Sequence, residues 1–241
     1  MSSSSQTLFA TTRWTLIQEA ARGGQVEARE ALEALIQTYW QPLYRYARRR
    51  GKSKEDGEDL VQGFFTHLIE SEGLQSLHQE KGRFRTFLLS SFNHWMINEW
   101  KRASRLKRGG GVLTLSFDWE NAETGLALDV GHEKSPDKLY DQEWALALLG
   151  KVVNDLEQLC VEEGNGVQFS ALKSCLTTDS NRISYVELAQ ELVMSEGALR
   201  VAVHRLRKRY RGLLKDEVTR TLDSPALVEE EMQSLFAALS S

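Results

Sequence analysis

The chain has 241 residues, which is enough for one large domain or two ordinary ones. Apolar residues make up 41% of it and charged residues 27%, the balance of a soluble globular protein. No stretch approaches the roughly 18 consecutive apolar residues of a membrane span, and the serine-rich start lacks the basic and apolar parts of a signal peptide. We therefore expect a cytoplasmic protein without a membrane partner.

The net charge of −4 hides a strong segregation of charge along the chain. Residues 81–108 carry eight basic side chains and one acid, and residues 198–215 carry seven basic side chains and no acid. Between these two islands, residues 112–143 carry eight acids and two lysines. The low net charge therefore does not exclude a nucleic acid as the partner of either basic island.

Three amphipathic helices rich in aromatic residues are expected in the N-terminal half. Apolar side chains recur at three- and four-residue steps over residues 28–47, and Gly51 ends this helix. Ser53 is a plausible cap for a second helix, whose buried stripe includes Phe64. A third helix is expected from about residue 84 to residue 107. Together the three helices can close one core.

The rest of the chain predicts a second helical domain after a break. Residues 112–138 mix acids, Asn, Gly and Thr without a helical period, so we expect a flexible acidic linker there. The fold class is therefore all-α, with two small helical domains at residues 1–111 and 139–241. The second domain ends in an acidic helix, from about Pro225 to Leu239, which could cap that domain or hold the protein inactive by covering a basic face.

A helix-turn-helix is predicted by residues 184–214, which read SYVELAQELVMSEGALRVAVHRLRKRYRGLL. Its short first helix is expected to bury Val186, Leu188, Ala189 and Leu192. Ser195 can cap the second helix, whose outer face is basic. Arg200 is the candidate for a base contact, because a guanidinium pairs bidentately with guanine. The expected DNA-binding residues are Ser195, Glu196, Arg200, Val201, His204, Arg205, Arg207, Lys208 and Arg211.

At this point the sequence resembles extracytoplasmic-function sigma factors of RNA polymerase. The helix-turn-helix is similar to their promoter-reading C-terminal domain. The stretches YWQPLYRYARRRG, EDGEDLVQGFF, KGRFRTFLLSSFNHWMINEWKR and KRGGG follow the order and spacing of their N-terminal domain. The ending VEEEMQSLFAAL resembles the tail of a subgroup common in planctomycetes and relatives. The resemblance covers nearly the whole chain and implies a sigma factor that directs promoter recognition, DNA melting and transcription initiation.

The resemblance implies three surfaces. The C-terminal domain would read the minus-thirty-five element of the promoter. The polymerase clamp helices would bind Asp56, Glu58, Asp59 and Gln62 in the N-terminal domain. The minus-ten element would be bound and melted by Lys81, Arg83, Arg85, Asn93, His94, Asn98, Lys101, Arg102 and Arg105. Core RNA polymerase and promoter DNA are thus the implied partners, with a Ser/Thr protein kinase or a protein inhibitor as further ones. Gly57 and Val193 depart from the Ala and Gly that the family often has there.

Three other functions are open to such a sequence. A polymerase-independent helix-turn-helix regulator would explain the C-terminal half but not the aromatic N-terminal half. A pure interaction adaptor would leave both basic islands without a role. An enzyme acting on nucleic acid is disfavoured, because the chain has no P-loop and no H-E-x-x-H motif. Cys160 and Cys175 fit no zinc or redox spacing and are expected to be buried apolar residues. We therefore expect no catalytic activity, no cofactor and no metal site.

Overall fold

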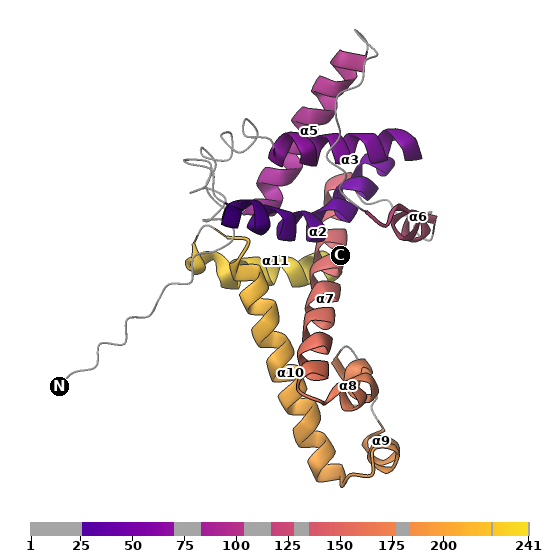
Figure 1. Ribbon diagram of the computed structural model, residues 1–241, viewed down its shortest axis with the longest axis vertical. Coiled ribbons are helices and arrows are strands. Elements are labelled where there is room, and N and C mark those ends of the chain that lie inside the picture. Colours follow the sequence, from indigo (N-terminus) through magenta and orange to yellow (C-terminus); the bar gives the residue numbers. More distant parts are fainter. Residues whose placement is uncertain are drawn as a thin grey trace, which may run out of the picture. The chain divides into compact units, whose positions relative to one another are not determined.

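The computed structural model describes residues 26–69, 83–103, 117–127, 135–176, 184–222 and 224–240. Within these ranges the chain is all-α, as the sequence predicts (Figure 1). The α-helices are α2 (Val26–Arg49), α3 (Lys54–Ile69), α5 (Phe84–Ala103), α6 (Trp119–Ala127), α7 (Pro136–Glu162), α8 (Gly166–Leu172), α9 (Tyr185–Glu191), α10 (Glu196–Thr219) and α11 (Val228–Ser240). Two 3-10 helices, η2 (Lys173–Leu176) and η4 (Pro225–Leu227), complete the described elements. None of the described helices is both long enough and apolar enough to cross a membrane.

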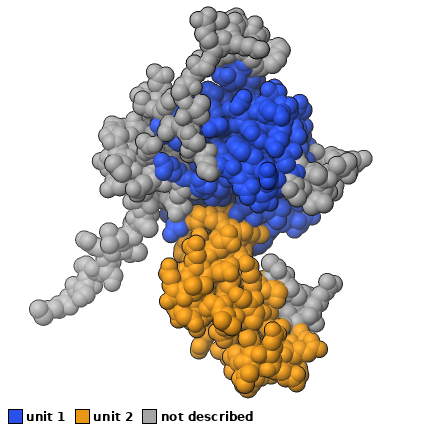
Figure 2. All heavy atoms as spheres, turned by 45° about the vertical axis from the view of Figure 1, so that its right-hand side comes forward, with its two compact units in different colours: residues 1–147, 218–241 blue, residues 148–217 orange. Residues whose placement is uncertain are grey.

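The residues group into two compact units, coloured separately in Figure 2. Unit 1 comprises residues 1–147 and 218–241, and unit 2 comprises residues 148–217. The boundaries fall inside α7 and inside α10. The acidic helix α11 thus belongs to the same compact unit as the N-terminal helices, whereas the sequence-based boundaries assign it to the C-terminal domain. The functional division into domains stays a prediction.

The turn between α2 and α3 has the structure that its residues predict. Gly51 adopts a φ of +83°, in the left-handed region that glycine enters without a steric penalty. The amide of Lys52 donates to the carbonyl of Ala47 (3.2 Å) and the amide of Gly51 to that of Arg48 (3.0 Å), which is a Schellman end. Ser53 Oγ then accepts from the amide of Asp56 (3.0 Å), so the expected cap of α3 is confirmed.

Aromatic side chains from α2, α3 and α5 fill the core of unit 1. Tyr39 packs edge-on against Phe84 with ring centroids 5.0 Å apart, and Phe64 packs against Phe92 at 5.2 Å. Burial of large rings dominates the stabilisation of a small helical core, and edge-to-face pairs add about 0.5–1.5 kcal/mol each. The buried side chains include Ile36, Tyr39, Leu43, Tyr44, Tyr46, Val61, Phe64, Phe65, Leu68, Phe84, Phe87, Leu88 and Phe92. The three expected helices therefore do share one core.

The expectation of a linker without regular structure at residues 112–138 is wrong for its described part. Helix α6 forms there, and Phe117 and Trp119 lie against Trp40 of α2, with ring centroids 4.8 Å and 5.1 Å apart. Arg45 also donates to the carbonyl of Ala122 (3.0 Å). A helix of nine residues is too short to show a clear hydrophobic period. Its contact with α2 comes instead from Phe117, just before the helix, and from Trp119 at its start.

Unit 2 is built on a smaller apolar cluster from α7, α8, η2, α9 and α10. Its buried members are Leu156, Cys160, Phe169, Leu172, Cys175, Ala189, Leu199, Val203 and Leu206. Both cysteines are free and buried, as expected. In α9 the sequence-based prediction fails at one position, because Val186 is 56% exposed. Leu188 and Leu192 are partly buried against the cluster, and Leu192 lies just after α9. A helix of seven residues presents too narrow a face to bury Val186 as well.

Candidate nucleic-acid interface

The turn between α9 and α10 is tight and stores backbone strain. Val193 has a φ of +52°, which is unusual for a β-branched residue. The amide of Met194 donates to the carbonyl of Ala189 (2.9 Å), and the amide of Val193 to that of Gln190 (3.2 Å). Ser195 Oγ accepts from the amide of Ala198 (3.2 Å) and caps α10, as predicted. The turn therefore fixes where α10 begins and which of its faces points inward.

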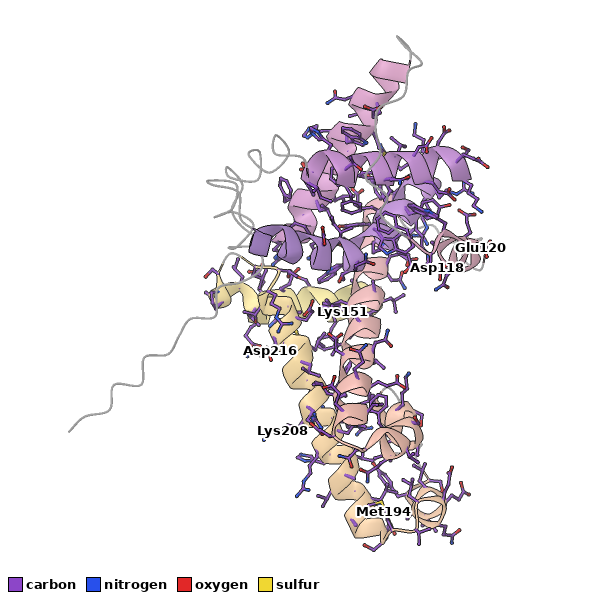
Figure 3. All side chains as sticks on the ribbon, viewed as in Figure 1. Asp118, Glu120, Lys151, Met194, Lys208 and Asp216 are labelled. Atoms are coloured by element: carbon purple, nitrogen blue, oxygen red, sulfur yellow. The ribbon has the colours of Figure 1, made fainter. Side chains whose placement is uncertain are left out.

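Helix α10 separates an apolar face from a basic face. Leu199, Val203 and Leu206 are buried in the unit 2 cluster, at the three- and four-residue steps of one helix side. The sequence-predicted DNA-binding residues lie on its remaining surface, and Lys208 extends outward from the helix (Figure 3). All are exposed except Arg207, which is half-buried. The exposed ones are Ser195, Glu196, Arg200, Val201, His204, Arg205, Lys208 and Arg211.

Arg200 is held in one orientation by two neighbours. Its Nε and Nη2 donate to Glu196 Oε1 at 3.0 Å and 2.6 Å, one helical turn earlier. Its guanidinium also lies over the ring of Tyr185 on α9, 4.3 Å from the ring centroid. A cation over an aromatic face is worth about 0.5–1 kcal/mol at an exposed site. Tyr185 was missed by the sequence-based prediction, because nothing in the pattern tells which residue of α9 faces Arg200.

A basic groove of about 260 Å³ lies beside this contact. It is lined by Tyr185, Arg200, Val203, His204, Arg207, Lys208 and Arg211. Its side chains come from both helices of the predicted helix-turn-helix. A concave surface lined by arginine and lysine suits the phosphate backbone of DNA, which takes the majority of protein–DNA hydrogen bonds.

Two arginines of α10 are engaged within unit 2. Arg207 Nε donates to the carbonyl of Cys175 (2.9 Å), which ties the middle of α10 to η2. Arg209 forms a bidentate pair with Glu163, both N–O distances being 2.7 Å. This pairing raises the pKa of Arg209 and lowers the pKa of Glu163. The basic charge of α10 is thus partly structural, and the predicted phosphate role of Arg207 stays a prediction.

The predicted polymerase-binding residues lie on the first turns of α3, in unit 1. Asp56 and Asp59 are exposed, and Glu58 and Gln62 are half-buried. Gly57 between them is buried, and an added Cβ there would lie 3.1 Å from Tyr44 Cε2 and 3.2 Å from Arg48 Cδ. The close approach of α2 thus explains why glycine stands at this position.

The exposed acids of α3 border an open groove of about 400 Å³ between α3 and α5. It is lined by Lys52, Asp56, Asp59, Leu60, Gly63, Trp95, Met96 and Glu99. Trp95 Nε1 donates to the carbonyl of Leu60 (3.2 Å), and its ring stacks on His67 with centroids 5.1 Å apart. Trp95 is therefore a half-buried wall of this groove, anchored to α3.

The residues predicted to bind the minus-ten element are described only in part. His94 and Asn98 are exposed on α5, and Asn93 Oδ1 accepts from the hydroxyl of Tyr46 (3.0 Å). Lys81 and Arg105 lie outside the described residues, as do the side chains of Lys101 and Arg102.

Arg83 and Arg85, the other two predicted minus-ten residues, are bound by acids of α11. Arg85 is 8% exposed, and its Nε and Nη2 donate to Glu231 at 2.6 Å and 3.3 Å. Arg85 also pairs with Asp141 and lies over the ring of Trp144, 4.6 Å from its centroid. Burial lowers the pKa of Arg85, but the hydrogen bonds and charges of Glu231 and Asp141 outweigh it and raise that pKa.

The comparisons with known proteins identify the segment that contains these arginines. Residues 35–106 match the family model of Sigma-70 region 2. The match covers less than a third of the chain and supports a sigma-70 family member. Sigma-70 family factors are transcription initiation factors without enzymatic activity of their own. Sigma-70 region 2 binds core RNA polymerase and minus-ten promoter DNA. Among the curated proteins and among the solved structures, none matches this chain.

The matched segment contains α3, α5 and most of α2. It therefore includes the predicted polymerase-binding residues and all of the predicted minus-ten residues. The helix-turn-helix of unit 2 lies outside it. In the described part of the chain, no group of three or more His, Cys, Asp or Glu side chains is arranged to hold a metal ion.

Proposed function

We propose that this chain is an RNA polymerase sigma factor of the extracytoplasmic-function type, which directs promoter recognition, DNA melting and transcription initiation. The observation that carries the proposal is the match of residues 35–106 to Sigma-70 region 2, in a chain whose unit 2 presents a capped, basic helix on a helix-turn-helix. In this proposal the region 2 segment binds polymerase and minus-ten DNA, and α10 contacts the upstream promoter element. Polymerase performs the chemistry.

The N-terminal part of the proposal concerns the acidic start of α3. Asp56 and Asp59 are exposed on one helix together with the half-buried Glu58 and Gln62. Acids on a protein surface steer and orient a basic partner more than they add raw affinity. In the proposed function this surface docks on the clamp helices of polymerase, and exposed residues of α5 such as His94 and Asn98 then face minus-ten DNA.

The C-terminal part concerns α10. Its exposed residues Arg200, Val201 and His204 follow the cap within about two and a half turns, which is where a recognition helix reaches base edges. Arg200 reads a base in this proposal, because its forked guanidinium suits the O6 and N7 acceptors of guanine. Lys208 and Arg211, further along the helix, bind phosphates and set the register.

The polymerase contact can be tested without relying on any promoter. Asp59→Lys and Glu162→Lys each change the net charge by two and replace an exposed acid, but only Asp59 belongs to the proposed surface. We expect Asp59→Lys to weaken binding to bacterial core polymerase at least about tenfold, because like charges at an interface cost several kcal/mol. Glu162→Lys is expected to bind as the unchanged protein does. Equal polymerase binding by the unchanged protein, Asp59→Lys and Glu162→Lys would refute this docking surface.

A polymerase-independent regulator makes the opposite prediction for DNA. Such a protein binds duplex DNA tightly on its own, whereas a sigma factor gains specific DNA binding once it joins polymerase. Electrophoretic mobility of a duplex carrying the promoter region of its own gene, with and without core polymerase, separates the two. Tight binding to that duplex by the free protein, together with no binding to polymerase, would favour the regulator.

A further inference from the structure

Five arginines of the region 2 segment pair with acids that lie outside that segment. All are described residues of unit 1. On α2, Arg48 pairs with Glu123 of α6, while Arg45 and Arg49 pair with Glu143 of α7. At the start of α5, Arg83 pairs with Glu230 and Glu231 of α11, and Arg85 pairs with Glu231 and Asp141. Acidic residues from outside the matched segment therefore neutralise these five arginines of it.

The contact made by α11 is the most extensive of these for the predicted DNA-binding residues. Glu231 is 1% exposed, and its two oxygens lie 2.9 Å from Arg83 Nε and 2.6 Å from Arg85 Nε. Ser234 Oγ, one turn later, lies 3.4 Å from Arg83 Nη1. The backbone adds a bond from the amide of Phe84 to the carbonyl of Thr221 (3.1 Å). The C-terminal segment is thus held at the start of α5 by side chains and by backbone.

The chemistry of this contact is the chemistry of a phosphate site. A guanidinium fork matches the geometry of a carboxylate and of a phosphate equally, so both anions compete for the same donors. The contact has an outer pair, Arg83 and Glu230, whose side chains are 22% and 65% exposed. It also has an inner pair, Arg85 and Glu231, which is almost closed to solvent. A polyanion arriving from solvent therefore meets the outer pair first.

We propose that α11 is an internal competitor of DNA: its carboxylates occupy the phosphate-binding arginines at the start of α5, and the DNA backbone displaces α11 from them, beginning at the outer pair. The proposal rests on the proposed function, because it takes Arg83 as a contact to minus-ten DNA. Since α11 is part of the same chain, its effective concentration is high and it competes without a partner. The free protein therefore holds its region 2 segment in a state with low affinity for DNA.

The test compares two substitutions that remove the same charge from the same turn. Glu230→Gln breaks the outer pair, whereas Glu229→Gln removes the same charge from the neighbouring exposed glutamate. The probe is a fluorescein-labelled single strand of mixed sequence, on the order of 20 nucleotides, longer than a usual single-strand site. Its affinity is measured by anisotropy at about 50 mM salt, where phosphate contacts are strong. We expect Glu230→Gln to bind the probe about two- to five-fold more tightly, the range of an exposed ion pair.

Two further measurements keep the test independent of folding defects and of net charge. Adding Arg83→Gln to Glu230→Gln is expected to remove the gain in affinity. Hydrogen exchange of the amides of residues 228–240 is expected to speed up when the unchanged protein binds the probe. Equal gains for Glu229→Gln and Glu230→Gln would assign the effect to long-range charge and overturn the proposal. Unchanged protection of α11 in the bound state would make it a permanent part of the fold and also overturn it.

Core polymerase binding separates failure of this proposal from failure of the proposed function. If Asp59→Lys loses polymerase binding while the two α11 variants behave identically, the proposed sigma factor function is retained and the competitor role of α11 is rejected. If the chain binds neither polymerase nor the probe in any variant, both proposals fail.

Discussion

The strained turn before α10 gives a prediction whose magnitude can be worked out. Val193 adopts a φ of +52° and its side chain is 92% exposed. An L-residue in the left-handed region costs about 1–2 kcal/mol, and this exposed side chain recovers almost none of that through burial. Val193→Gly removes the steric penalty but adds unfolded-state entropy worth about 0.5–1 kcal/mol. The net expectation is a stabilisation of about 0.5–1 kcal/mol, localised in unit 2.

Native-state hydrogen exchange measures this change at the turn itself. The amide of Met194, which donates to the carbonyl of Ala189 at 2.9 Å, reports the opening of the turn. The expected stabilisation slows its exchange roughly two- to five-fold, provided that exchange is limited by the opening equilibrium. Amides in the core of unit 1, such as that of Leu43, serve as an internal reference and are expected to be unchanged.

Val193→Ala is the matched control for this prediction. Alanine removes the branched side chain but keeps the Cβ, which is the atom that clashes in the left-handed region. It is therefore expected to gain less than Val193→Gly. If alanine stabilises the turn as much as glycine, the exposed valine side chain and not the backbone is the source of the strain. Faster exchange of the Met194 amide in the glycine variant, or loss of the turn, would contradict the reasoning outright.

Three further outcomes are expected. Tyr185→Leu should weaken binding of the polymerase complex to the upstream element roughly two- to five-fold, and Arg200→Ala should weaken it more. Neither substitution should change the affinity for a duplex of scrambled sequence. An equal loss of affinity for that duplex would make Arg200 a phosphate contact. The hydrogen bond with Arg48 lowers the pKa of Glu123, so ionised Glu123 stabilises the docking of α6 fully at pH values above its ordinary pKa of 4.5. This stabilisation is lost as the pH falls through the lowered pKa. The Trp119 indole signal in NMR spectra should follow the loss, and Glu123→Gln should abolish the pH dependence. Gly57→Ala should lower the free energy of unfolding by about 1 kcal/mol, because the new methyl group lies too close to side chains of α2. This loss is expected although alanine has the better helix propensity. A higher denaturation midpoint would show that those side chains move aside at little cost.

Local signals in the sequence account for the elements and their ends. Gly51 and Ser53 predict the turn between α2 and α3, because a left-handed backbone conformation and a helix cap depend on neighbours in the chain. The buried face of α10 follows equally from the spacing of Leu199, Val203 and Leu206. These features could be predicted because each depends on a few adjacent residues.

Pairings over long separations could not be predicted. The sequence displays basic islands and acidic stretches, but nothing local tells that Glu231 meets Arg85, 146 positions away. For the same reason α6 was missed, since Trp119 gains its burial from Trp40 on another helix. The sequence left open whether the acidic C-terminal helix caps the second domain or holds the protein inactive by covering a basic face. In the fold α11 contacts Arg83 and Arg85 of unit 1, a pairing that no local pattern indicates.

Run-off transcription tests the central claim most directly. The full chain is added to bacterial core polymerase on the promoter region of its own gene. The account predicts a discrete new transcript that depends on the chain and is lost in Asp59→Lys and reduced in Arg200→Ala, but is retained in Glu162→Lys. The absence of any transcript, with the chain binding that DNA without polymerase, would contradict the sigma factor and leave the polymerase-independent regulator.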